Sequence, residues 1–177
     1  QMALTQEQVS QLYVALFGRA SEGEGNQNFI NQNKAMGETA DLMLATDAAK
    51  DYYGSSMDSN DAFIKFIYLN TFGKSYEDDK AGIDAWVAYL NDSGKSRGEV
   101  VAEMIVEAVD PKNAGAAQDL FNNKVAVSNY MAENVYNNPA DWETSTAFKS
   151  NAKPAGALNV TSDPESVTAA EKIIDEM

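Results

Sequence analysis

Residues Leu12–Arg19 read LYVALFGR, and residues Ile67–Lys74 read IYLNTFGK. Tyrosine, phenylalanine, glycine and a cation recur in the second phrase, each 55 residues after its counterpart, as from Tyr13 to Tyr68. In both phrases the aliphatic residue, the tyrosine and the phenylalanine share one helix face, and the glycine stands where a helix would end. A fixed period of this size is typical of duplicated supersecondary units. The sequence therefore predicts two related helical units.

Residues on either side of the first phrase predict the helices of the first unit. Thr5 and Gln8 form a capping box, so a helix is expected to begin at Gln6 and to end at Gly18. A flexible polar loop over residues 21–25 is expected to precede helices over residues 26–34, 38–44 and 47–53. In the second of these helices, the residues expected to face inward are Leu42, Met43 and Ala45.

The second unit shows the same order of signals. The expected elements are a helix with Ser59–Asp61 as its cap that runs to Gly73, a loop over 75–82, a helix to Leu90, a helix capped by Ser96 and a long helix over 116–133. We expect an all-α fold of eight to nine helices: a multi-helix bundle of two duplicated units, a closing helix and a C-terminal extension. The duplicated helical domain covers residues 3–135, with units at about 5–54 and 59–135. Residues 136–177 are expected to form a loop, a turn at 153–156 and a last helix from Pro164, in which Ile173 and Ile174 have no obvious partner. Whether this segment belongs to the domain or begins the next region is left open by the sequence.

Composition excludes several classes of function. The chain of 177 residues has 27 acidic and 13 basic residues and a net charge of −14, which disfavours nucleic acid as a partner. It has neither cysteine nor histidine, which removes disulfides, thiolate nucleophiles, most zinc sites and imidazole catalysis. No apolar stretch is long enough for a membrane span. Residues 1–7 lack the pattern of a secretion signal, and the last helix ends abruptly at Met177, so we expect an N-terminal region of a longer protein.

The two phrases and the loops that follow them also resemble a known module. LYVALFGRASEGEGNQNF and IYLNTFGKSYEDDKAGIDAW are similar to the helical module repeated in bacterial surface-layer and RTX-type secreted proteins. They depart from its usual form in having Phe29 in place of tryptophan and Lys74 in place of arginine. Residues 3–135 most fully resemble the N-terminal region of Campylobacter-type surface-layer (S-layer) proteins.

That resemblance implies a non-enzymatic function. It implies an extracellular protein, exported by type I secretion, whose N-terminal domain attaches the S-layer non-covalently to lipopolysaccharide. Other S-layer subunits are then expected partners, with a homo-oligomer as one form. The alternative is a protein–protein assembly module of a secreted surface protein. An enzyme is not expected, because carboxylate pairs arise by chance among 27 acidic residues.

Candidate ligand-binding residues lie where the two units differ, around their unequal loops. The acidic run Glu77–Asp79 is the weak candidate for calcium, the only cofactor considered, although a solvated loop is the favoured interpretation. The aromatic residues of the two phrases are expected in the core, because they share a face with aliphatic residues. The candidate binding residues are Glu22, Glu24, Asn26, Tyr76, Glu77, Asp78, Asp79 and Trp86.

Overall fold

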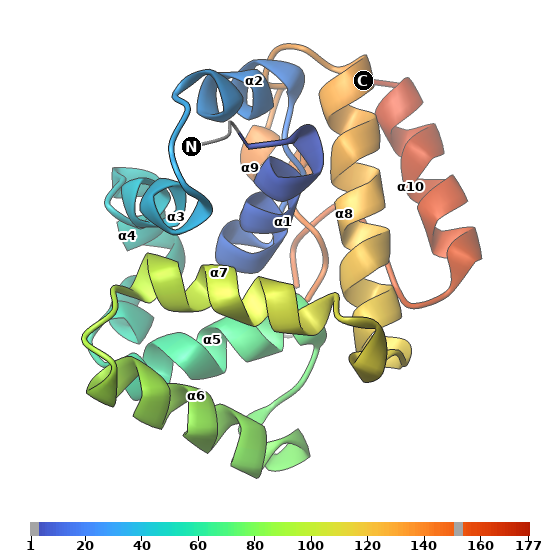
Figure 1. The fold of residues 1–177 in the computed structure, drawn as a ribbon. Helices are drawn as coiled ribbons and strands as arrows, with labels where there is room; N and C mark the ends of the chain where they lie inside the picture. Colours follow the sequence, from blue (N-terminus) through green and yellow to red (C-terminus); the bar gives the residue numbers. More distant parts are fainter. Residues whose placement is uncertain (1–3, 151–153) are drawn as a thin grey trace.

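The computed structural model describes residues 4–150 and 154–177, and within these ranges the protein is about 70% helical, without β-strands. The all-α prediction is confirmed (Figure 1). Lys153 of the expected turn lies outside the described residues. The ten α-helices of the described ranges are α1 (Gln6–Phe17), α2 (Gly23–Asn31), α3 (Met36–Leu44), α4 (Asp47–Tyr53), α5 (Asn60–Phe72), α6 (Lys80–Asp92), α7 (Arg97–Ala108), α8 (Ala116–Asn134), α9 (Trp142–Ser145) and α10 (Pro164–Asp175).

The duplicated phrase forms two equivalent helix ends, as predicted. Gly18 ends α1 with φ 56°, and Gly73 ends α5 with φ 66°. This left-handed conformation is open to glycine but strained for other residues. In both cases the backbone N–H of the glycine and that of the following cation donate to the carbonyl of the motif tyrosine, Tyr13 or Tyr68. The capping box of Thr5 and Gln8 at the start of α1 is also present.

Corresponding helices of the two units pack against each other in the interior. α3 crosses α7 closely at Gly98, where a β-carbon would lie 2.5 Å from the carbonyl oxygen of Gly37. α1 packs against both α5 and α8. The long helix α8 therefore closes the pair of units, and α10 lies along its outer side (Figure 1).

The chain after α8 folds back onto the first unit. Phe148 is buried, and its backbone N–H donates to the carbonyl oxygen of Gly18 at 2.8 Å. Isolated β-bridges join Arg19 to Ala147 and Phe148 to Leu158. Part of the candidate site of the first unit is covered as a result, as described below.

The described residues form ten α-helices where eight to nine were expected, and three further local predictions were wrong. The expected loop over residues 21–25 is mostly helical, because the Glu22 side chain accepts from the Gly25 N–H and starts α2 at Gly23. Met43 is buried in α3, but Leu42 is 41% exposed and Ala45 is exposed as well, because the face of α3 is set by its crossing with α7. Ile174 does have a partner, since it is buried and α10 packs on α8, whereas Ile173 remains 41% exposed.

Candidate functional site

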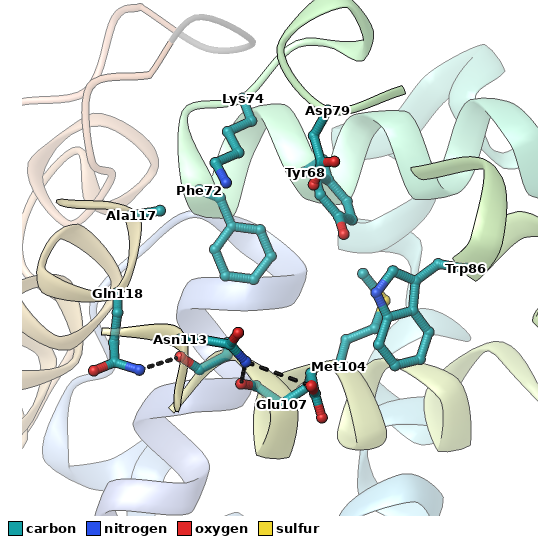
Figure 2. Close-up of a pocket in the computed structure, with 11 residues that line it drawn as sticks. Tyr68, Phe72, Lys74, Asp79, Trp86, Met104, Glu107, Asn113, Ala117 and Gln118 are labelled. Carbon is teal, nitrogen blue, oxygen red and sulfur yellow. Dashed lines mark hydrogen bonds between the residues drawn. The ribbon is translucent and has the colours of Figure 1, made fainter. Parts of the chain in front are cut away.

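The second unit contains a cavity of about 250 Å³ between α5, α6, α7 and the beginning of α8 (Figure 2). Helix α5 contributes aromatic residues, α6 contributes Trp86, and the connection between these helices contributes a cation and an acid. Helix α7 and the segment leading to α8 supply the opposite wall. The lining residues are Tyr68, Phe72, Lys74, Asp79, Trp86, Met104, Glu107, Ala108, Asn113, Ala117 and Gln118.

Local chain signals position the residues on the motif side of the cavity. Tyr68 and Phe72 are four residues apart in α5 and therefore share one face, with ring centroids 5.4 Å apart. The left-handed turn at Gly73 then reverses the chain and brings Lys74 to the cavity. Asp79 is the N-cap of α6 and accepts from the Gly82 N–H at 3.1 Å, so its carboxylate is held at the cavity wall.

The first unit has an equivalent cavity of about 230 Å³. Its lining residues Tyr13, Phe17 and Arg19 are the counterparts of Tyr68, Phe72 and Lys74. Glu22 caps α2 as Asp79 caps α6, and the aromatic four residues after the loop glycine lines each cavity. The prediction that the motif aromatics lie only in the core is therefore incomplete: they pack on the core and also line a cavity in each unit.

The two cavities differ in the contacts that their cations, Arg19 and Lys74, make with other residues. The Arg19 guanidinium stacks over the Trp142 ring at 4.2 Å and donates to the carbonyl oxygen of Glu143 at 3.2 Å. Burial lowers the pKa of this guanidinium, and Trp142 itself lines the first cavity. Among the residues described, by contrast, no carboxylate pairs with Lys74. The second cavity therefore combines aromatic rings with a lysine that has no ion pair within 4.0 Å among these residues, although its charge helps to lower the pKa of Asp78.

The carboxylates of the second cavity are engaged in structural contacts. Glu107 pairs with Lys112 at 2.9 Å, and hydrogen bonds from Lys112 and Asn113 lower the pKa of its carboxyl group. Burial raises the pKa of Tyr68 to about 12, and the nearby Asp79 adds to this rise. At neutral pH the wall therefore holds a neutral phenol and an ionised Glu107, which is not the proton-holding carboxyl group that a general acid requires.

Trp86 also faces an open apolar groove on its other side. The groove has a volume of about 770 Å³ and is lined mainly by α6 and α7, with Gln8 of α1 and Met36 of α3. Tyr89 packs edge-on against Trp86 with ring centroids 5.9 Å apart, and Val106 is 65% exposed at the surface. The lining residues are Gln8, Met36, Ala85, Trp86, Tyr89, Ala102, Glu103, Val106 and Glu107.

Only three of the residues predicted from the sequence line these cavities: Glu22, Asp79 and Trp86. Glu24 is exposed on the first turn of α2. Asn26 is 2% exposed, and its side-chain amide donates to Ser21 Oγ at 3.0 Å, so it has a structural contact inside the fold.

The acidic side chains of the loop over residues 75–82 bind to nearby residues of the same segment. Glu77 pairs with Lys80 at 3.0 Å, and Tyr76 donates to Asp84 Oδ2 at 3.0 Å. Asp78 accepts from the backbone N–H and the side chain of Ser75, which lowers the pKa of its carboxyl group. Across residues 4–150 and 154–177 no group of three or more acidic side chains is placed to hold a metal ion.

The residues missed by the sequence argument are the motif residues themselves. Tyr68, Phe72 and Lys74 were interpreted as a core stripe and a helix stop, and Glu107 was not singled out. The repeat could have indicated these residues, because a residue type that recurs at the same position of both units can line a cavity as well as pack in the core.

Similarity to known proteins is confined to part of the chain. Residues 40–108 match the model of a family described as a domain of unknown function (DUF4214). The matching segment runs from α3 to the end of α7, so it contains Tyr68, Lys74, Asp79 and Trp86 but not the wall contributed by α8. Comparisons with curated proteins and with solved structures gave no match.

Proposed function

We propose that this domain is a non-enzymatic anchoring module that attaches an extracellular surface-layer protein to lipopolysaccharide. The observation that carries the proposal is the cavity of the second unit, in which aromatic rings stand beside an acid and beside Lys74, which has no ion pair within 4.0 Å among the described residues. The resemblance of residues 3–135 to S-layer proteins supplies the biological setting.

The second cavity has the chemistry of a sugar site. Aromatic faces stack against the apolar face of a pyranose ring, while polar groups bond its hydroxyls. In a sugar complex the Lys74 ammonium would donate to a hydroxyl oxygen, and the Asp79 carboxylate, which also caps α6, would accept from a hydroxyl group. The side-chain amides of Asn113 and Gln118 already donate to the carbonyl oxygens of Glu107 and Ala108, each at 2.8 Å, which leaves their own oxygens as acceptors (Figure 2).

Trp86 provides a direct test, because the chain has only two tryptophans. In the Trp142→Phe protein, fluorescence reports on Trp86 alone. Purified lipopolysaccharide, titrated at physiological calcium, is expected to change this emission and to give a matching calorimetric isotherm. Trp86→Phe, which keeps an aromatic ring of smaller area, is expected to weaken binding about three- to tenfold.

The matched control is Trp142→Phe itself, since Trp142 is engaged by Arg19 and lies in the first cavity. It is expected to bind lipopolysaccharide as the unsubstituted protein does. If neither method detects binding to lipopolysaccharide from any serotype tested, the anchoring proposal is refuted.

The open groove favours a second function, protein–protein assembly between neighbouring S-layer subunits. Val106 is 65% exposed on an apolar surface, which is a frequent feature of protein contacts. Val106→Glu is expected to reduce the mass seen by light scattering at high protein concentration without changing lipopolysaccharide binding. A monomer at every concentration, with and without calcium, would exclude this alternative.

A further inference from the structure

The lysines that lack ion pairs gather at one place. Ten lysines lie in the described ranges, and six of them pair with carboxylates within 4.0 Å. Four have no such partner: Lys172 on α10 and three others. Those three, Lys74, Lys124 and Lys149, line the same hollow. In a chain with a net charge of −14, this concentration of unpaired cations requires an explanation.

The hollow encloses about 480 Å³ between the end of α5, the first turns of α8 and the chain around Lys149 and residues 159–162. None of the described residues that line it is acidic. Residues with hydroxyl or amide side chains also line it, and Phe72 and Lys74 are shared with the cavity of Figure 2. The lining residues are Leu69, Phe72, Gly73, Lys74, Ala116, Ala117, Leu120, Lys124, Lys149, Ser150, Asn159, Val160, Thr161 and Ser162.

Lys124 is the most unusual member of the group. It is 2% exposed, and its ammonium donates to the backbone carbonyl oxygen of Asn70 at 3.1 Å. A carbonyl oxygen carries only a partial charge, so the ammonium is buried without a counter-charge, and burial lowers its pKa to about 8. An anion in the hollow would supply the missing charge.

The N-terminus of α8 adds to the positive potential. This helix has 19 residues, and its N-cap is Gly115, which offers no side chain to cap the first backbone N–H groups. Its dipole therefore points its positive end at the hollow, where Ala116 and Ala117 form part of the wall.

We propose that this hollow binds a phosphate group, carried as an ester on a sugar of the glycan. A phosphate ester has a charge close to −2 and several acceptor oxygens, which suits three ammonium groups arriving from separate segments. Because Lys74 and Phe72 line both sites, one ligand can place its sugar ring in the Trp86 cavity and its phosphate against the lysines. The proposal that the phosphate is carried by the glycan rests on the proposed anchoring function. The proposal that the hollow binds a phosphate group does not.

The test uses calorimetry and ³¹P nuclear magnetic resonance at low ionic strength in a phosphate-free buffer. Inorganic phosphate and glucose 6-phosphate are expected to bind with a Kd on the order of 0.1–1 mM, whereas glucose is not. Lys149→Gln and Lys74→Gln are each expected to weaken phosphate binding about five- to tenfold. The matched control is Lys172→Gln, which removes an unpaired lysine outside the hollow and is expected to change nothing.

Three outcomes would overturn the phosphate site. They are no heat and no ³¹P shift up to about 10 mM phosphate, an equal loss of affinity in Lys172→Gln, and binding of glucuronate as tight as that of glucose 6-phosphate. The Trp86 titration with lipopolysaccharide separates the two proposals. Phosphate binding without lipopolysaccharide binding refutes only the anchoring function, and the reverse result refutes only the phosphate site.

Discussion

Replacing the buried Lys124 by methionine is expected to stabilise the protein at neutral pH. The ammonium has a pKa of about 8 in the folded protein against an ordinary value of 10.5. At 1.36 kcal/mol per pKa unit, this difference corresponds to about 3 kcal/mol by which the folded protein is destabilised at pH 7, where the lysine is charged in both states. Lys124→Met removes this term but also the hydrogen bond to Asn70, worth about 1 kcal/mol. The expected net gain is about 2 kcal/mol.

The sign of the pH dependence gives a sharper test. Between pH 8 and pH 10.5 the unfolded chain keeps the lysine proton and the folded protein loses it. The free energy of unfolding of the unsubstituted protein therefore rises with pH in this window, while Lys124→Met lacks this contribution. From pH 8 to 9.5 the advantage of the variant should shrink by about 2 kcal/mol.

Urea denaturation followed by circular dichroism, in phosphate-free buffers at pH 7, 8, 9 and 9.5, measures these differences. Lys172→Met is the control, because Lys172 is exposed and should show no such trend. An advantage of Lys124→Met that stays constant from pH 7 to 9.5 would refute the argument that Lys124 is desolvated.

Three further predictions concern the motif and its loops. Gly18→Ala should lower the free energy of unfolding by about 3 kcal/mol, and Gly73→Ala should lower it by about 1–2 kcal/mol. Both substitutions strain a left-handed turn, but only at Gly18 would the new β-carbon lie 2.4 Å from Asn70. Equal losses in urea denaturation would contradict this. Ser96→Ala should cost about 1–2 kcal/mol by the same assay, since Ser96 Oγ accepts from the Glu99 N–H and donates to Asp41, and a loss under about 0.3 kcal/mol would show that this cap is unimportant. Calcium at about 1 mM should raise the melting temperature by less than about 1 °C, because Glu77, Asp78 and Asp79 serve local contacts; a clear rise in a calorimetric scan would restore a calcium site.

Helix ends were readable from the sequence because their causes are local. The capping box at Thr5, the cap at Ser96 and the left-handed stops at Gly18 and Gly73 each depend on atoms a few residues apart. Such contacts depend little on the rest of the fold, so the all-α class could be predicted from them.

The direction in which a side chain faces was harder to predict. α3 has only nine residues, with apolar side chains on more than one face, and its crossing with α7 buries Met43 while leaving Leu42 exposed. Ile174 is buried where α10 packs on α8, a helix that ends at Asn134, and the sequence pattern of the last helix gives no indication of this contact.

The sequence by itself determined the all-α class, most of the helices and the ends of α1 and α5 at Gly18 and Gly73. Only the tertiary structure decided that the motif residues line a cavity in each unit, and that α9 covers the cation of the first cavity while Lys74 has no ion pair within 4.0 Å among the described residues. It also brought Lys74, Lys124 and Lys149 to one hollow, although they are 50 and 25 residues apart along the chain. The physical reason is that helix formation depends on neighbours within a few residues, whereas a binding site depends on which faces of distant helices are packed together.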